Sequence, residues 1–484
     1  MKLPDAFVSS MTAYFESHPE ISKSGFFESF DLPSYRGLRL NRLKVNPAED
    51  EKILCALGNS MENIPWCKSG YYSDEKISGN DPYFHAGVFY MQEPSAMLPA
   101  EVLSSNPGER ILDLCAAPGG KATRIAEGMN GQGIFIANDI SYDRTKALLR
   151  NIERLGIENA VILSESPERL ALRFPEYFDK TLIDAPCSGE GMFRRDPSAI
   201  RSWENYGTSK TTAMQRDILE QADAMLRPGG SIVYSTCTFS REEDEGMIEW
   251  FIGKHQGYQV IEEVNIRGVS VNSTLGLTKG SMRIWPHISK GDGHFCVLLQ
   301  KAYDGSQDPG KKIINDYTTH LVPRGSLLNA IQVMKIFFSG LLTEEAYEQF
   351  LNKIDVGTVL LGNKIHFHPL LPSLYDGLKM IKMGGFPGEI VSKGNDLMFI
   401  PSQSLALSLS QKQIRPERFL NLDRGDERLN RYLKGETVFL EEREISSLEE
   451  GRSLIVAVDG FSLGFAKKTS STLKNMYPKS WRVM

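Results

Sequence analysis

The middle of the chain alternates short apolar runs with longer segments in which apolar residues return at helical spacing. One such segment, residues 144–156, ends in Gly156, a residue that helices favour just after their last turn. Strands that alternate with helices are typical of a doubly wound α/β fold on a parallel sheet. The predicted strands cover residues 109–114, 133–139, 159–164, 180–186, 230–236 and 294–299.

Both flanking regions have mixed patterns. Residues 5–17 and 50–60 have helical spacing, whereas residues 36–44 alternate as a strand does. We therefore predict a small α+β domain over residues 1–95, followed by the sheet domain over residues 96–302. A stretch rich in turn-forming residues predicts a linker at 303–325, and a C-terminal α+β region follows over 326–484. For that last region we predict a helix at 328–353 and strands at 358–363, 365–368 and 453–459.

Composition narrows the class of protein. The 484 residues are 41% hydrophobic and 24% charged, an ordinary globular mix. No stretch approaches the roughly 20 apolar residues of a membrane helix, and the first residues do not resemble a signal peptide, so we expect a cytoplasmic protein without membrane contact. The six cysteines form no C-x-x-C pair, so we expect free thiols and no metal site. No coiled-coil pattern is present, and we expect a monomer.

A glycine-rich loop follows the first predicted strand of the sheet. Backbone N–H groups between a strand end and a helix start bind nucleotides in such folds, and Gly119 and Gly120 allow close approach. The loop lacks both the dinucleotide and the P-loop spacing. Asp139 ends the next strand, where a carboxylate can bind ribose hydroxyls, so S-adenosylmethionine is the favoured cofactor; the alternative is a tight turn, with Asp139 capping a helix. The loop consists of Cys115, Ala116, Ala117, Pro118, Gly119, Gly120 and Lys121.

Two further cysteines follow strands that end at the same edge of the predicted sheet. Cys187 lies in D-A-P-C-S-G-E-G and Cys237 in S-T-C-T. Methylation of carbon 5 of a pyrimidine needs a nucleophile that first adds to carbon 6, and a thiolate is suited to this. The addition also needs a proton for ring nitrogen 3, for which a protonated Asp184 is the candidate. From this chemistry alone either thiol could attack. We expect the other cysteines, Cys55, Cys67, Cys115 and Cys296, to be inert.

Four motifs together resemble the Nol/Nop/Sun family of RNA cytosine-5 methyltransferases. They are D-L-C-A-A-P-G-G-K, D-A-P-C-S-G-E-G, L-R-P-G-G-S-I-V-Y-S-T-C-T and Q-E-P-S-A-M. The tail at 466–479 is similar to the RsmF-type subfamily, which acts on 16S ribosomal RNA. The resemblance implies a class I methyltransferase fold that binds S-adenosylmethionine, an N-terminal RNA-binding domain over residues 1–95, and a PUA-like RNA-binding module at the C-terminus.

The resemblance also implies roles for individual residues. Cys237 would be the nucleophile, Cys187 would assist product release, and Asp184 would contact the target base and cofactor. Lys121 would lie in the active site and Asp139 on the cofactor ribose. Relatives often have an aspartate after the third strand to contact the adenine; this chain has Glu165-Ser166-Pro167 instead, so Glu165 is the expected substitute.

RNA contacts are expected at three places, although the net charge is −6. Arg194 and Arg195 follow the Cys187 loop and could bind phosphates, or could simply be paired with acids. The resemblance adds Arg39. In the tail, Lys467, Lys468 and Lys474 lie near Tyr477 and Trp481, a combination typical of RNA-binding surfaces. The predicted partner is ribosomal RNA of the small subunit; the alternatives are the same reaction on transfer RNA, or a non-catalytic ribosome-assembly factor.

Overall fold

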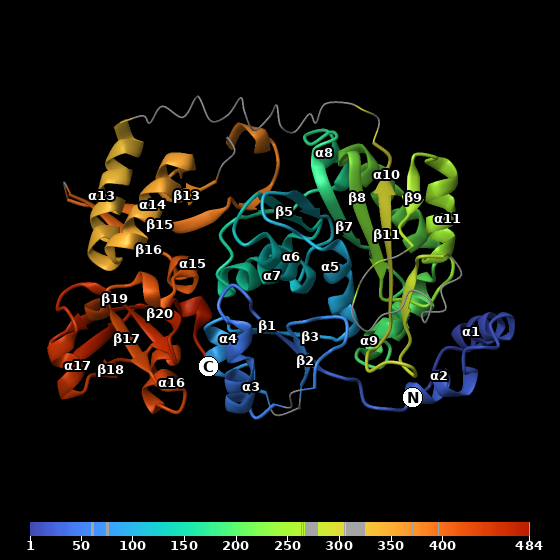
Figure 1. The fold of residues 1–484 in the computed structure, drawn as a ribbon, viewed down its shortest axis with the longest axis horizontal. Helices are drawn as coiled ribbons and strands as arrows, with labels where there is room; N and C mark the ends of the chain where they lie inside the picture. Colours follow the sequence, from blue (N-terminus) through green and yellow to red (C-terminus); the bar gives the residue numbers. More distant parts are fainter. Residues whose placement is uncertain are drawn as a thin grey trace.

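The computed structural model describes residues 1–59, 62–73, 77–262, 264, 266, 279–303, 305, 325–368, 372–394 and 396–483. Figure 1 shows a central sheet with helices packed on it, an N-terminal pair of helices at one end and the C-terminal strands at the other. The predicted linker at 303–325 lies almost wholly outside the described residues. Within the described residues, no helix is long and apolar enough to cross a membrane.

The central sheet has the strand order β10-β11-β8-β7-β4-β5-β6-β14, with β9 paired to β11. The strands β8, β7, β4, β5 and β6 run parallel, as predicted. The prediction of a parallel strand at 294–299 was wrong, because β11 is antiparallel to β8. An apolar run reports that a strand is buried and does not report its direction. The bounds are β4 Arg110–Asp113, β5 Ile134–Asn138, β6 Ala160–Leu163, β7 Phe178–Asp184, β8 Leu226–Thr236, β9 Tyr258–Val260, β10 Met282–Ile284 and β11 His294–Lys301.

Helices cover both faces of this sheet. Side chains of α5, α6 and α7 share one apolar core, and those of α8, α10 and α11 share another on the opposite face. The helix predicted at 144–156 is α7, whose buried Leu148 and Ile152 lie four residues apart; Ser141 caps its start, and Gly156 follows its end with φ of 77°. The bounds are α5 Leu98–Leu103, α6 Gly120–Met129, α7 Tyr142–Arg154, α8 Pro167–Ala171, α9 Pro197–Tyr206, α10 Ser209–Met225 and α11 Glu245–Lys254.

The N-terminal region consists of two separately packed pieces. The phenylalanines of the first two helices pack on Phe239 and Trp285 of the sheet domain. The rings of Phe239 and Trp285 are stacked on each other, with their centroids 5.4 Å apart. The second piece is a small antiparallel sheet with the order β2-β1-β3, and its strand β1 lies within the predicted strand 36–44. The bounds are α1 Asp5–Ser17, α2 Lys23–Ser29, β1 Gly37–Leu40, α3 Asp50–Leu57, β2 Gly70–Tyr72, α4 Pro82–His85 and β3 Phe89–Gln92.

The C-terminal region contains a four-stranded and a five-stranded sheet. The prediction of one helix at 328–353 was wrong, because Thr343 caps the start of a second helix and ends the first near Leu341. The bounds are α13 Gly325–Leu341, α14 Glu344–Gly357, β12 Thr358–Leu361, β13 Lys364–Phe367, β14 Met380–Lys382, β15 Gly385–Lys393, β16 Asp396–Pro401, α15 Gln403–Ser408, β17 Phe419–Leu422, α16 Glu427–Lys434, β18 Val438–Phe439, α17 Glu442–Ser447, β19 Ser453–Val458, β20 Phe461–Thr469 and β21 Thr472–Asn475.

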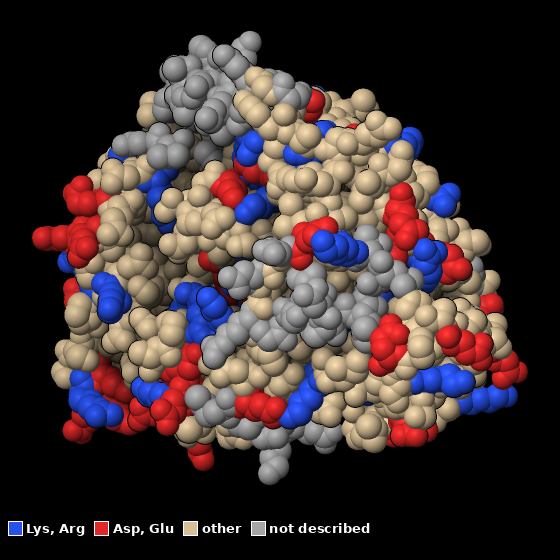
Figure 2. All heavy atoms as spheres, turned by 45° about the vertical axis from the view of Figure 1, so that its right-hand side comes forward, with Lys and Arg blue, Asp and Glu red and all other residues tan. Residues whose placement is uncertain are grey.

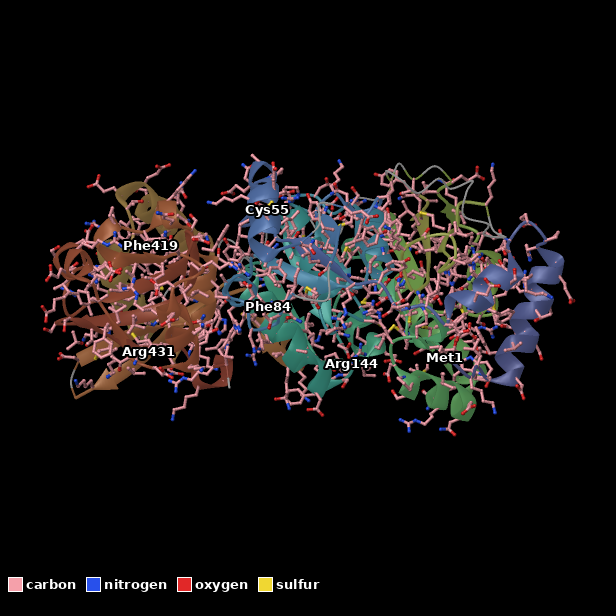
Figure 3. The ribbon with its side chains drawn as sticks, turned by 90° about the horizontal axis from the view of Figure 1, so that it is seen from below. Met1, Cys55, Phe84, Arg144, Phe419 and Arg431 are labelled. Carbon is pink, nitrogen blue, oxygen red and sulfur yellow. The ribbon has the colours of Figure 1, made fainter. Side chains whose placement is uncertain are left out.

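Packing crosses each of the predicted domain boundaries. Strand β14 comes from the C-terminal region but pairs with β6 of the central sheet. One apolar core joins residues of β1, α3 and β3 to residues of α16, β19 and β20. In Figure 3, Phe84 lies between the C-terminal part, marked by Phe419 and Arg431, and Arg144 on α7. The boundaries at 95, 302 and 325 therefore stay predictions, and the regions are not independent packing units.

Candidate active site

The two cysteines singled out by their motifs meet at one edge of the central sheet. Strands β7 and β8 run parallel with Asp184 paired to Ser235, so both strands end at the same level. The loops that follow bring the Sγ atoms of Cys187 and Cys237 to 3.4 Å from each other. Both side chains are partly exposed, and all six cysteines are free thiols. The expectation that Cys187 and Cys237 face one site is thus consistent with the geometry.

Direct hydrogen bonds hold the two cysteine loops together. The Gly191 backbone N–H donates to the Cys237 carbonyl at 2.9 Å, and a Cβ at Gly191 would come as close as 2.9 Å to the same oxygen. The Phe239 N–H donates to Glu190 Oε2 at 2.9 Å, and the Ser188 N–H donates to Glu243 Oε1 at 3.0 Å. By binding the backbone of the two loops, these two carboxylates therefore fix the positions of both thiols.

Burial and local contacts set the protonation of the groups around the thiols. The hydrogen bond with Cys237, together with burial, raises the pKa of Cys187 well above the usual value of a thiol, so Cys187 is protonated. Burial also raises the pKa of Glu190 to about 7. The site therefore holds a protonated thiol at Cys187 and, near neutral pH, a carboxyl group that titrates.

Asp184 forms the centre of a charged cluster beside the thiols. Its Oδ2 accepts from Lys121 Nζ at 2.7 Å, and its Oδ1 accepts from Ser235 Oγ at 3.1 Å. Burial raises the pKa of Asp184, but Lys121 outweighs this effect, and the pKa lies below its ordinary value. The expectation of a protonated Asp184 was therefore wrong for this structure. Lys121, whose pKa Asp184 raises against the effect of burial, is the member of the pair that carries the proton.

His294 also belongs to this cluster, and the sequence reasoning missed it. Because β11 runs antiparallel and pairs Phe295 with Thr236, its first residue lies at the edge where the parallel strands end. The Nε2 atom of His294 lies 3.7 Å from Asp184 Oδ1, and burial lowers the pKa of the imidazole to about 3. His294 is therefore neutral. A histidine at the start of a strand becomes a signal only when the direction of that strand is known.

A cavity of about 210 Å³ adjoins Asp184 and the glycine-rich loop. Strand β3 and the residues after it close one side, which the sequence reasoning did not anticipate. Gly120 permits this contact, since a Cβ there would lie 3.1 Å from the Gln92 side chain. Of the expected cofactor residues, the cavity is lined by Cys115, Ala116, Ala117, Pro118, Gly120, Lys121 and Asp184. It is also lined by Tyr90, Met91, Gln92, Glu93, Ala96 and Asp113.

Gly119, Asp139 and Glu165, which were also expected at the cofactor, do not line this cavity. Asp139 is 2% exposed; it accepts from the Ala117 N–H at 3.3 Å and pairs with Arg144 at 3.2 Å. Asp139 therefore braces the loop in this structure. Glu165 accepts from the Lys379 N–H, just before β14, and so helps to hold the C-terminal region on the sheet.

Several residues expected to bind RNA are buried inside the protein. Arg39 is 0% exposed and pairs with Glu127. The Arg194 side chain is 2% exposed and pairs with Asp292 at 2.6 Å, and Arg195 pairs with the same carboxylate. The expectation of surface phosphate contacts was therefore wrong for Arg39 and Arg194, which are buried against acidic partners. The sequence could not show this pairing, because the partners are distant along the chain. Arg195 is partly exposed, but it is also paired.

The C-terminal tail shows the same effect. Lys468 is 5% exposed and donates from Nζ to the Leu448 carbonyl at 2.7 Å. The rings of Tyr477 and Trp481 are buried in the apolar core, so the expectation that they belong to an RNA-binding surface was wrong as well. Lys467 and Lys474 are exposed and remain free to contact RNA.

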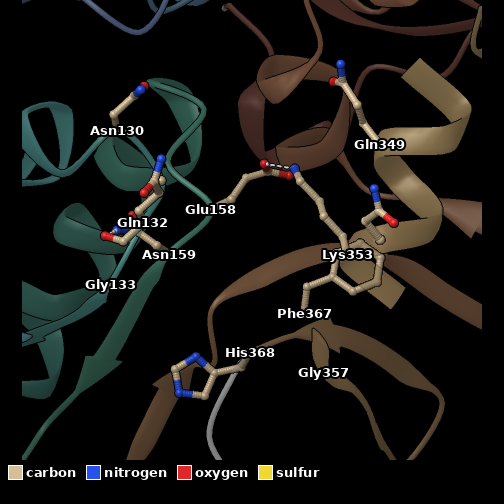
Figure 4. A pocket seen from close by; sticks show the side chains of 12 residues that line it. Asn130, Gln132, Gly133, Glu158, Asn159, Gln349, Lys353, Gly357, Phe367 and His368 are labelled. Atoms are coloured by element: carbon tan, nitrogen blue, oxygen red, sulfur yellow. Dashed lines mark hydrogen bonds and ion pairs between the residues drawn. The ribbon is translucent and has the colours of Figure 1, made fainter. Parts of the chain in front are cut away.

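A larger cavity of about 610 Å³ lies elsewhere, between the central sheet and α14 (Figure 4). An ion pair of 2.6 Å between Glu158 and Lys353 crosses it, and most of its other polar groups are amides. Gly133 and Asn159, which directly precede β5 and β6, place it at the opposite edge of the sheet from the thiols. The described residues that line it include no cysteine, serine or threonine. Within the described residues, no cluster of side chains could hold a metal ion.

Comparisons with known proteins identify families and relatives that the chain resembles. Three family models match: the N-terminal domain of 16S rRNA methyltransferase RsmF at residues 3–94, 16S rRNA methyltransferase RsmB/F at 100–300, and the methyltransferase RsmF PUA domain at 419–483. The chain is 29% identical over 486 residues to the ribosomal RNA small subunit methyltransferase F of Klebsiella pneumoniae (strain 342), covering 98% of this chain and 96% of that protein.

Two solved structures share the fold. The crystal structure of PH0851 has a TM-score of 0.56 at 28% identity and covers 62% of this chain and 66% of its own. NSun6 from Pyrococcus horikoshii, solved with SFG, has a TM-score of 0.54 at 23% identity over 62% of this chain and 99% of its own. The three matched family models, which together span most of the sequence, and the relative matched over nearly its full length place the chain in the RsmB/RsmF family of 16S rRNA methyltransferases.

Proposed function

We propose that this protein transfers a methyl group from S-adenosylmethionine to carbon 5 of a cytosine in 16S ribosomal RNA, through a covalent bond between Cys237 and carbon 6. The observation that carries the proposal is the pair of thiols 3.4 Å apart, beside the Lys121–Asp184 pair that lines the cavity. A single nucleophile would suffice for attack. A second thiol within contact distance suits a reaction in which the first bond must later be broken.

The first step is addition to the ring. The Cys237 sulfur, as thiolate, forms a bond to carbon 6, and the electron pair of the carbon 5–carbon 6 double bond becomes available at carbon 5 while ring nitrogen 3 takes a proton. That proton comes from the Lys121–Asp184 pair, in which Lys121 carries it. Asp184 orients the Lys121 ammonium through the 2.7 Å contact.

The second step is release. Once carbon 5 carries the methyl group, it must lose its proton, the Cys237–carbon 6 bond breaks with its electron pair returning to the Cys237 sulfur, and the double bond between carbons 5 and 6 re-forms. Nitrogen 3 returns its proton to the Lys121–Asp184 pair, while the Cys187 thiol gives its proton to the departing Cys237 sulfur and takes up the proton of carbon 5. We assign assistance in this step to Cys187, whose sulfur is the nearest side-chain partner of Cys237. Ser188 and Glu190, bonded to Thr238 and Phe239, keep the two loops in register through both steps.

The cofactor part of the proposal rests on fit and on likeness. S-adenosylmethionine, when bound, supplies an electrophilic methyl group. The glycine-rich loop at 115–121 lines the cavity, and Gly120 leaves room where a side chain would collide with Gln92. NSun6 from Pyrococcus horikoshii was solved with SFG, an analogue of S-adenosylmethionine. Asp139 reaches the ribose only if its pair with Arg144 opens, and we propose that it does.

The substrate test uses labelled S-adenosylmethionine with purified 30S subunits, free 16S ribosomal RNA and bulk transfer RNA in parallel, followed by nucleoside analysis. The expected result is 5-methylcytidine in ribosomal RNA only. Label in transfer RNA only would overturn the substrate. No label in any sample, together with measurable cofactor binding, would favour a non-catalytic assembly factor.

The mechanism is tested with three cysteine variants. Cys237→Ala is expected to abolish methyl transfer and the covalent adduct. Cys187→Ala is expected to accumulate a protein–RNA adduct that survives denaturing electrophoresis. The exposed Cys55, on α3, provides the matched control Cys55→Ala, which should behave as the wild type. Normal turnover by Cys187→Ala and adduct formation by Cys237→Ala would show that the roles are wrong.

A further inference from the structure

A second cavity near the active site concentrates positive charge. It measures about 630 Å³ and opens between the segment that follows β1, the turn before β2, and helix α6. We name it the basic groove. It is lined by Arg42, Leu43, Lys44, Val45, Asn46, Pro47, Asp50, Lys68, Ser69 and Arg124.

The charge of this groove differs from that of the chain. Its lining contains Arg42, Lys44, Lys68 and Arg124, and Asp50 is the one acidic residue among the described residues that line it. Burial lowers the pKa of Lys44 to about 7, so three cations are permanent at neutral pH. The whole chain has a net charge of −6, and on the face drawn in Figure 2 basic and acidic side chains are interspersed. Asp50 offsets one of these charges, so the lining keeps a net positive charge, which attracts anions.

Carboxylates hold the two arginines in place. Arg42 binds Asp50 through both terminal nitrogens, and Tyr71 donates to the same carboxylate at 2.6 Å. Arg124 uses Nε and Nη2 on the two oxygens of Glu101, so its Nη1 makes no hydrogen bond to any other described residue. A guanidinium that is already fixed loses little side-chain entropy when it binds an anion. Lys68 is exposed and forms no ion pair within the described part of the chain.

The groove and the catalytic cavity are adjacent. Helix α6 contributes Lys121 to the cavity and Arg124, three residues later, to the groove. Residues three apart lie on the same side of a helix. The N-terminal sheet also serves both, because β3 lines the cavity and the segment after the neighbouring β1 lines the groove.

We propose that the basic groove binds the phosphodiester backbone of the substrate RNA beside the target base. The inference rests on the proposed function, since it concerns the RNA that enters that active site. A polyanion fits better than a small anion, because the cations come from three separate segments along an open cleft. An acidic protein surface is the competing occupant, and affinity measurements on naked RNA and on the 30S particle separate the two.

The test measures affinity for in vitro transcribed 16S ribosomal RNA by filter binding between 50 and 200 mM salt, without cofactor. Lys68→Ala is expected to weaken binding, and Lys68→Glu to weaken it further. For each phosphate that the variant no longer binds, the fall in affinity over this salt range should become about threefold smaller. Lys52→Glu, on α3 outside the groove, is the matched charge control and should bind nearly as the wild type does.

Three outcomes would overturn the groove. In the first, Lys68→Glu binds RNA with the affinity and the salt dependence of the wild type. In the second, Lys52→Glu loses as much affinity as Lys68→Glu does. In the third, Lys68→Glu loses affinity for the 30S particle and not for naked RNA, which would indicate a protein partner. Methyl transfer is measured separately. If the wild type methylates 16S ribosomal RNA and Lys68→Glu binds it normally, the groove alone fails. If the wild type binds RNA through the groove without methylating it, the proposed function alone fails.

Discussion

Arg39 was expected on an RNA-binding surface, yet the structure makes it a buried clamp between β1 and α6. Its guanidinium pairs with Glu127 and donates from Nη2 to Thr123 Oγ1 at 2.8 Å and to the Gly120 carbonyl at 3.3 Å. Both charged side chains are 0% exposed. Since Gly120 and Lys121 line the catalytic cavity, the clamp connects the N-terminal sheet to the site. Arg39→Ala should therefore affect stability and cofactor affinity together.

The size of the effect follows from the charge left behind. Removal of one partner of a buried ion pair costs about 3–5 kcal/mol, because the other charge stays buried without compensation. At an unfolding entropy of about 2.1 cal/mol/K per residue, the 484 residues give a shift of about 1 °C per kcal/mol, so the midpoint of thermal unfolding should fall by roughly 3–5 °C. The pair itself is incompletely satisfied: Arg39 Nε and Glu127 Oε2 are buried without a hydrogen bond to any described residue. Arg39→Met combined with Glu127→Leu should therefore stay within about 1 kcal/mol of the wild type.

The assay compares urea and thermal unfolding of four proteins: the wild type, the single variants Arg39→Ala and Glu127→Leu, and the double variant. Cofactor affinity of the same proteins is measured by calorimetric titration. The single variants are expected to be strongly destabilised and the double variant close to the wild type. The reasoning is refuted if Arg39→Ala costs less than about 1 kcal/mol, or if the double variant is as unstable as the single ones. Either result would mean that the pair is hydrated, or that Thr123 and Gly120 carry the contact.

Two further predictions concern the cofactor loop and the cysteine loops. Asp139→Ala should lower affinity for S-adenosylmethionine by about tenfold or more, as expected for the removal of a hydrogen bond to ribose worth about 1.5 kcal/mol; unchanged affinity by calorimetry would count against the ribose contact. Burial raises the pKa of Glu190 from its ordinary value near 4.5 to about 7, so the folded state binds this proton more tightly than the unfolded state does. Stability should therefore fall as pH rises from about 4.5 to 7, by up to about 3 kcal/mol, and Glu190→Gln should remove this part of the pH dependence in urea unfolding. An unchanged pH profile in Glu190→Gln would contradict the assignment.

The sequence was sufficient to predict the site where one geometric rule links a position along the chain to a location in the fold. Parallel strands end at a common edge, so residues directly after two apolar runs had to meet, and Cys187 and Cys237 do. The same rule placed the glycine-rich loop beside Asp184. It did not place His294, because the pattern of β11 gives no strand direction. Nor did it place Gln92, whose strand belongs to another sheet.

Charged residues were the least predictable from the sequence. Arg194 and Asp292 are 98 residues apart in the chain, and Arg39 and Glu127 are 88 residues apart. A pattern of neighbours along the chain carries no information about such partners, so cations that are buried and paired resembled free ones. Arg42 and Arg124 are also paired, yet they line an open groove. The side chains of Arg42 and Arg124 are 21% and 23% exposed, whereas those of Arg39 and Arg194 are 0% and 2% exposed.

The sequence chemistry also left open which thiol attacks, and the structure supplies a physical asymmetry between the two. The hydrogen bond between the thiols and burial raise the pKa of Cys187 well above normal, so Cys187 keeps its proton. Because the thiolate is the attacking form of a cysteine, a thiol that is held protonated is poorly suited to attack, which supports the proposed assignment of release to Cys187 and of attack to Cys237.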